Sequence, residues 1–546
     1  MFFYLSVNLS QPCLYFARIM IYDTIIIGAG SAGSILAARL TEDPSRSVLL
    51  LEAGPDYPDY DTLPVELKYG YGVDPELWGK AFGESSTHNW DFEGQATSDS
   101  KRNIRVPRGR VTGGSSSVNA QIFLRGVPED YESWVARGNE GWGYRDLLPY
   151  FLRIEKDPDF SGDFHSDEGA VPVRRWPKLE MLPDQLAFYD GCKALGFEES
   201  DDQNHPDSTG IGPTPFNNTG GIRWSTALTY LNPARHRLNL TIRPDVFVRS
   251  IVFEGDRATG VIVKSSSELF EIMAGEVILA GGAYASPQIL MLSGVGPASE
   301  LEQHDIPIVA DLQGVGKNLR DHPQVQLTFS TKPDFDQDPL EPRIQNALRY
   351  TASGSNYRND MFIHPLAQAA EFDTYTVPVG NTLRNGELGV GMIAAIYLAD
   401  GSGSITLRSS DPETQPNINF NYLAEDNDRK RFREAVHICL EISKQDKYAR
   451  IIDRLINPSA NDLVSEDALD DWLLRYVRTS HHASGTCKMG PVSDIEAVVD
   501  NEGRVHGLQS LRVADASIMP DCIRANTNVT TMVIGERIAD VIKGVS

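Results

Sequence analysis

The sequence predicts an α/β protein with a Rossmann-like domain and a second domain in which an antiparallel sheet is covered by helices. The first observation is a β-branched run at 21–27, followed by the glycine-rich turn GAGSAG at 28–33 and a helix-forming stretch at 34–43. The second is an apolar strand at 47–54, which completes a βαβ unit of about 30 residues. The third is a group of strand-like runs and amphipathic helices between 325 and 480.

The composition of the whole chain fits a large folded protein. The chain has 546 residues, of which 41% are hydrophobic, so two domains with a sizeable core can form. The formal net charge is −25, and such an acidic protein repels nucleic acid and anionic lipid. We therefore expect no nucleic acid and no membrane among its partners.

The five cysteines are widely spaced and form no CxxC motif. Neither a disulfide framework nor a zinc site is therefore predicted, and we expect no other metal site. Reduced thiols of this kind fit a cytoplasmic protein best.

The first 20 residues are apolar and aromatic, but they lack the basic segment and the cleavage site of a signal peptide. Polar residues and a proline interrupt the apolar run, which is therefore too short to span a bilayer. We expect residues 1–20 to be an N-terminal extension outside the fold.

The βαβ unit carries a dinucleotide-binding pattern. Gly28, Gly30 and Gly33 allow a tight turn, close approach of a pyrophosphate and close packing of the helix. The helix N-terminus then offers N–H donors and a positive dipole to the phosphates. Glu52, 24 residues beyond Gly28, can accept hydrogen bonds from ribose hydroxyls. The unit predicts binding of FAD or NAD, and the alternative is a purely structural glycine turn.

The segments that follow vary in regularity. Residues 56–100 lack periodicity and are rich in Asp, Tyr, Gly and Pro, which indicates long excursion loops. A second Gly/Ser-rich loop occupies 105–126, and strand-like pieces return at 240–264. Another strand–glycine–helix passage spans 276–296.

The later part of the chain predicts the second sheet and its helices. The runs 389–398, 404–409 and 417–423 have strand-like composition, with turns between them. Residues 428–445 and 464–477 form two amphipathic helices, the second with Ser465 as its N-cap and Asp467 in its first turn.

Two polar side chains near the C-terminus suggest chemistry. His482 and Asn526 lie 44 positions apart, each where a short turn meets an apolar segment. A neutral imidazole can accept a hydroxyl proton near neutral pH, and an amide N–H can hold the developing alkoxide oxygen. The pair therefore suits the oxidation of an alcohol, and the alternative is a structural histidine with a capping asparagine.

Four segments resemble signatures of the glucose–methanol–choline (GMC) flavoprotein oxidoreductases, and the likeness runs from about residue 22 to residue 542. They are GRVTGGSSSVNAQIFLRG at 109–126, GAYASPQILMLSGVG at 282–296, GVGKNLRDHP at 314–323 and the stretch 481–537. Thr112 departs from the aliphatic residue that is usual in the first segment. The resemblance implies FAD as the cofactor, in an FAD-binding Rossmann-like domain beside a substrate-binding domain.

The resemblance also implies roles for single residues. His482, in the pattern HxxGTC, falls on the catalytic histidine, and Asn526 falls on the position of its partner. Asn119 is expected to approach the flavin, and Asn528 is either a helix cap or a cofactor ligand at a helix N-terminus whose dipole stabilises reduced flavin. The full set of implied cofactor-binding residues is Gly28, Gly30, Ser31, Ala32, Gly33, Glu52, Ala53, Arg110, Gly113, Gly114, Ser115, Asn119, Val248, Asp515, Ala516, Asn528 and Val529.

Val118 stands where some relatives carry a histidine that bonds covalently to the flavin. Valine has no atom for such a bond, so we expect FAD to be bound non-covalently. His481 is expected in the wall of the substrate pocket. A choline substrate is disfavoured, because relatives that act on choline have an aromatic, non-basic residue at the position of His481.

The implied function is oxidation of a small-molecule alcohol to an aldehyde or ketone. His482 takes the hydroxyl proton, hydride passes to the flavin, and dioxygen or another acceptor then reoxidises the flavin. Two alternatives remain open at this point, an FAD-containing lyase of the hydroxynitrile-lyase type and a redox-inert flavin-binding protein.

The expected domain order alternates between the two domains. FAD-binding segments are expected at 21–150, 225–324 and 481–546, and substrate-domain segments at 151–224 and 325–480. His304, His322, His364 and His437 lack metal-ligand spacing and are expected to be structural or surface residues. Cys487 is expected to be a small buried residue and not a nucleophile.

Overall fold

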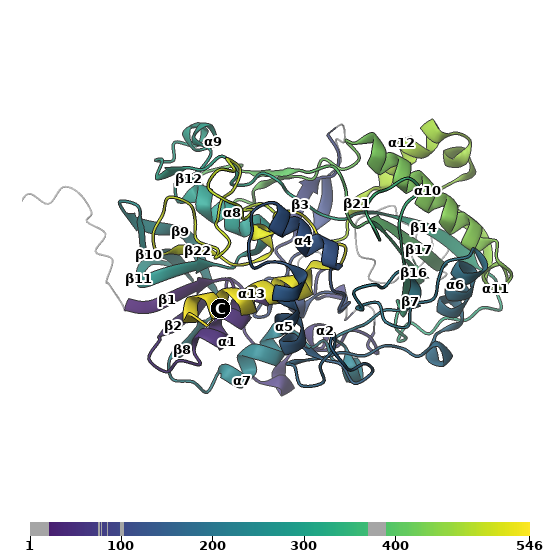
Figure 1. Ribbon diagram of the computed structural model, residues 1–546, viewed down its shortest axis with the longest axis horizontal. Coiled ribbons are helices and arrows are strands. Elements are labelled where there is room, and N and C mark those ends of the chain that lie inside the picture. The colour runs from purple at the N-terminus through teal and green to yellow at the C-terminus, as the bar shows by residue number, and fades with distance from the viewer. Residues whose placement is uncertain are drawn as a thin grey trace, which may run out of the picture.

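Two large sheets lie toward opposite ends of an elongated molecule, with helices packed against each (Figure 1). The computed structural model describes residues 21–74, 77, 79–83, 86–98, 103–369 and 389–545. The predicted extension at 1–20 lies outside the described residues. The α/β fold class predicted from the sequence is confirmed.

The first sheet has seven strands in the order β8-β2-β1-β11-β10-β9, with β22 paired to β11. Its parallel core confirms the predicted βαβ unit, because β1, β2, β8, β11 and β22 run in the same direction. Among them, β2 and the second half of β1 are buried, which explains their continuous apolar runs. The bounds are β1 Ile21–Ile27, β2 Val48–Leu51, β8 Leu240–Arg243, β9 Val246–Glu254, β10 Arg257–Ser265, β11 Glu268–Leu279 and β22 Leu511–Val513.

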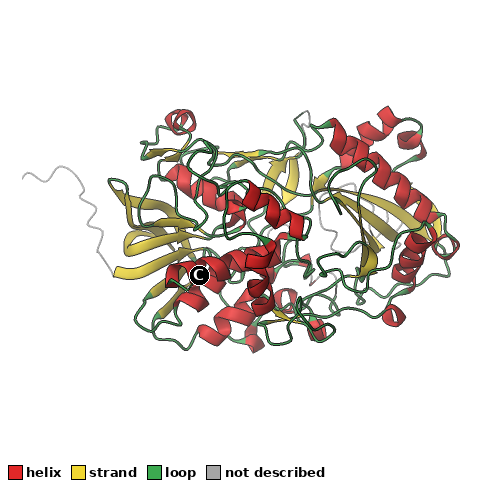
Figure 2. Cartoon of the chain, viewed as in Figure 1, coloured by secondary structure: helices red, strands yellow, loops and turns green. Residues whose placement is uncertain are grey.

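The second sheet also has seven strands, in the order β20-β14-β17-β16-β15-β7, with β21 paired to β14. Its strands pair antiparallel throughout the described residues, and helices cover it at the right of Figure 2. The strands are β7 Gly210–Pro213, β14 Pro323–Thr331, β15 Asn346–Tyr350, β16 Met361–Ala369, β17 Gly389–Ile396, β20 Ile452–Asn457 and β21 Arg478–Thr479. The helices are α6 Pro183–Ala194, α10 Asp426–Ser443, α11 Asp446–Ala449 and α12 Glu466–Tyr476.

The N-cap of α12 forms as predicted, since Ser465 Oγ accepts a hydrogen bond from the Ala468 N–H at 3.1 Å. Asp467 lies in the first turn, where its charge complements the helix dipole.

A third, four-stranded sheet departs from the sequence-based expectations. It joins β18 Ser404–Thr406 and β19 Asn417–Asn419 to β3 Phe92–Gln95 and β4 Asn103–Val106. The runs 404–409 and 417–423 therefore do not belong to the large second sheet, and the segment 56–100 is not loop throughout. Strand β3 lies close to the segment that follows β19 at Gly94, because a Cβ there would lie 2.8 Å from the Phe420 ring. A strand's own sequence does not identify its partner.

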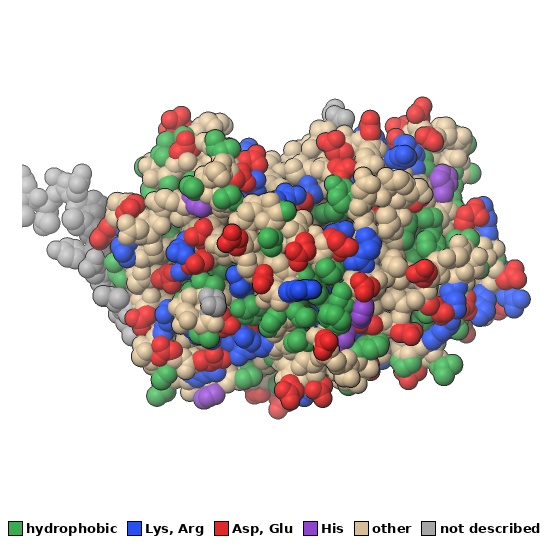
Figure 3. Space-filling model, viewed as in Figure 1, with side chains coloured by type: hydrophobic (Ala, Val, Ile, Leu, Met, Phe, Trp, Pro, Cys, Tyr) green, Lys and Arg blue, Asp and Glu red, His purple; other side chains and the backbone are tan. Residues whose placement is uncertain are grey.

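The remaining elements are short or connect the two large sheets. They are α2 Val65–Lys68, α4 Pro128–Ala136, α5 Tyr144–Ile154, α7 Asn232–Ala234, α8 Gly282–Leu292, α9 Ala298–Gln303, β5 Glu155–Lys156, β6 Val171–Pro172, β12 Val295–Gly296 and β13 Ala310–Asp311. Within the described ranges, no helix is both long and apolar enough to cross a membrane. Acidic and basic side chains are interspersed on the face shown in Figure 3.

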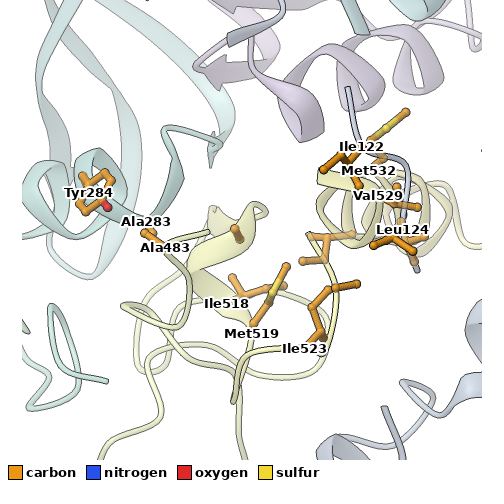
Figure 4. Close-up of a cluster of buried hydrophobic side chains, with 14 of the residues drawn as sticks. Ile122, Leu124, Ala283, Tyr284, Ala483, Ile518, Met519, Ile523, Val529 and Met532 are labelled. Atoms are coloured by element: carbon orange, nitrogen blue, oxygen red, sulfur yellow. The ribbon is translucent and has the colours of Figure 1, made fainter. Parts of the chain in front are cut away.

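The C-terminal helix α13, Thr527–Lys543, packs against α1, Ser31–Leu40. Gly535 permits this approach, since a Cβ there would lie 2.9 Å from the Ala32 carbonyl oxygen. On another side of α13, Val529 and Met532 lie beside Ile122 and Leu124 (Figure 4). The start of α13 is therefore fixed by packing with the glycine-rich turn region and with the loop at 105–126.

Candidate active site

A cavity of about 690 Å³ extends from the glycine-rich turn of the first sheet to strands β14, β16 and β17 of the second sheet. It is lined at one end by Gly28 and Gly30, and at the other by Gln326 and His364, with His482 and Asn526 also in its wall. One cavity therefore joins the predicted cofactor site and the predicted catalytic pair.

The glycine-rich turn has the shape that a bound dinucleotide requires. Gly28 has a φ of +98°, and a Cβ there would lie 2.6 Å from the Ala280 carbonyl oxygen. At Gly33, in the first turn of α1, a Cβ would lie 1.9 Å from the Gly28 carbonyl oxygen. Only glycine therefore fits at this position. At Gly30, by contrast, a Cβ would meet no atom within 4 Å. Gly30 thus keeps open a space against the N-terminus of α1, where phosphates bind favourably.

Glu52 closes the ribose end of this region. Its carboxylate accepts hydrogen bonds from the Ala29 N–H at 3.0 Å and the Gly54 N–H at 2.9 Å. Burial raises the pKa of Glu52 to about 7, partly offset by these backbone hydrogen bonds. Each oxygen can still accept from a ribose hydroxyl, so the residues present fit a dinucleotide cofactor.

The predicted cofactor residues divide into two groups. Thirteen line the cavity: Gly28, Gly30, Ser31, Ala32, Glu52, Ala53, Gly114, Ser115, Asn119, Val248, Asp515, Ala516 and Asn528. Four do not line it: Gly33, Arg110, Gly113 and Val529. Gly33 and Gly113 support the turn from behind, Val529 is fully buried in α13, and the Arg110 guanidinium lies over the Trp90 ring.

The loop at 105–126 packs directly on the glycine-rich turn. The Gly113 N–H donates to the Ala29 carbonyl oxygen at 2.7 Å, and a Cβ at Gly114 would lie 2.6 Å from the Gly30 Cα. Val118 lines the same cavity and offers no nucleophilic atom to a cofactor.

His482 and Asn526 are in direct contact. Asn526 Nδ2 lies 2.9 Å from His482 Nε2. Asn526 occupies the N-cap position of α13, but its side chain makes no capping hydrogen bond. The amide is therefore directed into the cavity, and the alternative of a capping asparagine is wrong.

A hydrogen-bonded chain fixes the tautomers of two histidines. His322 Nε2 lies 2.8 Å from the Ile523 carbonyl oxygen, which can only accept, so this nitrogen carries the hydrogen. In a neutral ring, His322 Nδ1 is then an acceptor. His482 Nδ1 lies 2.9 Å from it and must donate. His482 Nε2 is consequently the unprotonated nitrogen that faces Asn526.

Both rings are held neutral. Burial, with a smaller contribution from the charge of Arg320, lowers the pKa of His322 to about 3. Burial also lowers the pKa of His482 well below its ordinary value, with added repulsion from His322, His481 and Arg108. A neutral His482 has an unprotonated Nε2 that can accept a proton, and this nitrogen accepts a hydrogen bond from Asn526 Nδ2.

Asp321 brings the two histidine backbones together. Its Oδ1 accepts from the N–H groups of His322 and His482, each at 2.8 Å. Its Oδ2 accepts from the Tyr422 and Thr479 hydroxyls. Burial raises the pKa of Asp321, although these hydrogen bonds oppose the shift.

His481 also lines the cavity, as predicted. It has a φ of +67°, and its carbonyl oxygen accepts from Arg108 Nη1 at 2.6 Å. The pKa of the His481 ring is lowered to about 3, mainly by burial and to a smaller extent by repulsion from Arg108 and Arg478.

The interpretation of two other histidines as structural or surface residues is corrected. His322 contacts His482, and His364 lines the cavity. The segment GVGKNLRDHP contains Asp321 and His322, so its resemblance to a family signature was the available signal. His437 is exposed, and His304 is half-buried beside Glu300. Cys487 is fully buried and burial raises the pKa of its thiol, as expected for a residue that is not a nucleophile.

Models of the GMC oxidoreductase family match residues 22–324 and 399–535 of the chain. Among curated relatives, the oxygen-dependent choline dehydrogenase of Yersinia pseudotuberculosis serotype IB (strain PB1/+) is 39% identical, over 96% of this chain and 94% of the relative. That of Klebsiella pneumoniae subsp. pneumoniae is 38% identical, over 96% of each.

Solved structures show the same architecture. Pyridoxine 4-oxidase from Mesorbium loti has a TM-score of 0.86 and 29% identity, over 96% of this chain and 99% of that one. A formate oxidase variant from Aspergillus oryzae has a TM-score of 0.85 over 97% and 99% of the two chains. Its 24% identity supports likeness of fold alone.

Proposed function

The chain belongs to the GMC oxidoreductase family and is an FAD-dependent oxidoreductase acting on CH–OH donors, and we propose that His482 is its catalytic base. The observation that carries this proposal is the chain of hydrogen bonds that leaves His482 Nε2 unprotonated. A base at this atom needs no prior loss of a proton.

Each step that the protein performs follows from a named atom. His482 Nε2 accepts the proton of the substrate hydroxyl, and the resulting imidazolium keeps its Nδ1–H bonded to His322. Asn526 Nδ2 donates to the same oxygen as negative charge develops on it. Bound FAD supplies the acceptor for the hydride that leaves the carbinol carbon.

The thirteen cavity-lining residues identified above would hold FAD, from Gly28 at the phosphates to Asn528 at the start of α13. Val118 supports non-covalent binding, because its side chain cannot form a bond to the flavin. Acid or heat denaturation should release all the flavin into the supernatant. Flavin that remains with the precipitated polypeptide would contradict this proposal.

The electron acceptor is dioxygen or another oxidant, and a small-molecule alcohol is the donor. The dehydrogenase and oxidase relatives support redox chemistry and disfavour a lyase of the hydroxynitrile-lyase type. The described cysteines, Cys192, Cys439, Cys487 and Cys522, are free and buried, which supports the proposed cytoplasmic location.

The test is an anaerobic panel of alcohols read by stopped-flow absorbance of the flavin. Bleaching by one or more alcohols is expected, and admission of oxygen then distinguishes an oxidase from a dehydrogenase. Flavin that is bound at full occupancy but bleached by no alcohol would overturn the proposed function in favour of a lyase or a redox-inert protein.

A further inference from the structure

The far end of the cavity is a face of the second sheet. Its floor contains two cross-strand rows, in which residues of β14, β17 and β16 lie side by side. Gln324, Ala395 and Phe362 form the row nearer the catalytic pair, and Gln326, Ile393 and His364 form the next row. The cavity therefore extends along β16 from Phe362 to His364.

The first row adjoins the catalytic pair. Phe362 stacks on Tyr397 with ring centroids 4.5 Å apart, and the Tyr397 hydroxyl lies 3.5 Å from Asn526 Oδ1. His364 lies two residues farther along the strand, which places its Cα about 6.8 Å beyond that of Phe362. The second row is thus several bonds away from an alcohol oxygen at His482.

Two arginines converge on the second row. Arg343 and Arg478 both line the cavity, and Arg478 Nη2 donates to Gln326 Oε1 at 3.0 Å. The pKa of His364 is lowered to about 4, first by burial and then by repulsion from Arg478 and Arg343. Both charges therefore act on His364, and the guanidinium of Arg343 itself lies farther along β16, at Ala367 and Gln368.

Arg343 is placed to receive an anion. Its Nε and Nη2 donate to the carbonyl oxygens of Ala367 and Gln368 at 3.2 and 3.1 Å. Its Nη1 has no protein hydrogen-bond partner among the described residues. No carboxylate of those residues forms an ion pair with Arg343, and this includes the exposed Glu341 nearby. Burial and Arg478 lower the pKa of Arg343 to about 10, so it remains charged at neutral pH.

We propose that the alcohol substrate carries an oxyanion, a carboxylate or a phosphate, which binds Arg343 while its hydroxyl lies at His482. The proposal rests on the alcohol oxidation proposed above and names its substrate class. A desolvated cation is stabilised by an oxyanion in a charge-assisted, often bidentate, hydrogen-bonded pair. The part of the substrate between the two ends lies over Phe362, Ile393 and Ala395, which favour an apolar or aromatic spacer. A quaternary ammonium at the same place would be repelled.

Matched alcohols test the charge preference. We would compare 4-(hydroxymethyl)benzoate, 4-(hydroxymethyl)benzamide and a para-trimethylammonium benzyl alcohol by anaerobic flavin reduction. The carboxylate should exceed the amide in kcat/KM by about 10- to 100-fold, the range for one hydrogen bond to a charged group. The gain should appear chiefly in KM, and the ammonium compound should be the poorest donor.

Three variants assign the preference to a residue. Arg343→Met should lower the carboxylate-to-amide ratio at least about tenfold, and Arg343→Lys should retain most of it because the charge is kept. Arg454→Met is the matched control, since Arg454 is exposed on β20 of the same sheet and lies outside the cavity wall. It should leave the ratio unchanged. Binding of benzoate by calorimetry should weaken in Arg343→Met in parallel.

Two results would overturn the proposal. One is a preference for the ammonium or the amide over the carboxylate, and the other is an equal loss for carboxylate and amide in Arg343→Met. Both leave alcohol oxidation intact, because the neutral alcohol still bleaches the flavin. A fully loaded enzyme that no member of the series reduces, but that still binds benzoate in an Arg343-dependent way, would refute the proposed function instead.

Discussion

Two clusters of buried histidines differ in the direction in which the histidine pKa is shifted. His322 is fully buried beside His482, and His165 is 8% exposed in a cluster with three carboxylates. The pKa of His322 is lowered to about 3, whereas that of His165 is raised. Burial acts in the same direction on both rings, so the partners decide the outcome.

The partners of His165 are acidic. Its Nδ1 lies 3.2 Å from Glu155 Oε1, and its Nε2 lies 2.8 Å from Asp202 Oδ2. Burial alone would lower the pKa of His165, but hydrogen bonds to Asp157 and Asp202 outweigh it. Glu155, Asp157 and His165 are close enough to share a metal ion. Glu155 also pairs with Arg125, and Asp157 pairs with an arginine as well, so protein cations already balance these carboxylates.

Within the described part of the chain, no carboxylate contacts the rings of His322 and His482. The nearest acid, Asp321, accepts only from their backbone N–H groups. Asp321 thus positions both residues through their backbones and makes no hydrogen bond that would favour protonation of either ring. The comparison teaches that the cluster at His482 keeps a proton acceptor at neutral pH, while acidic partners favour the protonated form of His165.

Removal of the proposed base should have the largest effect. His482→Ala is expected to slow anaerobic flavin reduction by about 10²–10⁴-fold, the usual contribution of a positioned proton acceptor. FAD content should stay near that of the native enzyme, because the proposed phosphate and ribose contacts lie elsewhere, at Gly28 and Glu52. His437→Ala, at an exposed site, is the control. A His482→Ala enzyme with the native reduction rate would remove His482 from the mechanism.

Asn526→Ala should cost about 10²–10³-fold in the same assay, the scale of one donor to a developing oxyanion. Because Asn526 and His482 act on one oxygen, the double variant should be less impaired than the product of the single losses. Strictly multiplicative losses would show that the two residues act in separate steps.

His322→Phe should slow flavin reduction by about 10- to 100-fold, the range found when a group that orients a functional histidine is lost. The phenyl ring has no acceptor to hold the His482 hydrogen on Nδ1. The pH profile of flavin reduction should distinguish this role from a merely structural one. A mixture of His482 tautomers would change the apparent pKa of that profile. An unaltered rate and profile would reject the proposed tautomer control.

His165→Gln should leave flavin reduction unchanged but destabilise the fold by about 1–3 kcal/mol, the cost of leaving buried charged acceptors without their donor. Denaturant unfolding measures this loss. Slower flavin reduction at unchanged stability would reverse the roles that we assign to the two clusters.

The pH dependence of stability should differ in sign between the clusters. The raised pKa of His165 gives stability that is complete below about pH 6.5 and is lost as the pH rises through the folded pKa. The lowered pKa of His322 means that stability falls as the pH drops below about 6.5, because only the unfolded chain takes up the proton.

Unfolding measured between pH 5 and 8.5 tests these signs, with slopes of about 1.4 kcal/mol per pH unit per proton. His165→Gln should flatten the alkaline side of the profile, and His322→Phe should flatten part of the acid side. If each variant affects the opposite limb, the charge states assigned to the clusters are wrong.

Local sequence was enough to predict several parts of the fold and of the candidate site. The GAGSAG turn is confirmed as a βαβ crossover, because glycine is required by backbone contacts within a few residues of it. Ser465 is confirmed as the N-cap of α12, because the N–H that its side chain binds lies only three residues away, at Ala468. The pairing of His482 with Asn526 was predicted from chemistry and family resemblance, and the two side chains do lie in contact.

Other features depend on segments that are far apart in the chain. His322 was read as structural because nothing near it in sequence indicates a partner 160 residues away. The strand at 417–419 was assigned to the second domain, although it pairs with residue 95. Strand pairing depends on which edge is free in the folded molecule, and a strand's own pattern does not record that.

The sequence by itself determined the dinucleotide turn and the family and indicated the proposed base, because each depends on residue types and short spacings. Only the tertiary structure decided which nitrogen of His482 is unprotonated and which charged groups line the cavity. Both depend on the burial and partners of groups brought together by packing, among them the Ile523 carbonyl and the Arg343 guanidinium. The tautomer of a histidine and the sign of the charge that lines a pocket are therefore properties of the assembled fold.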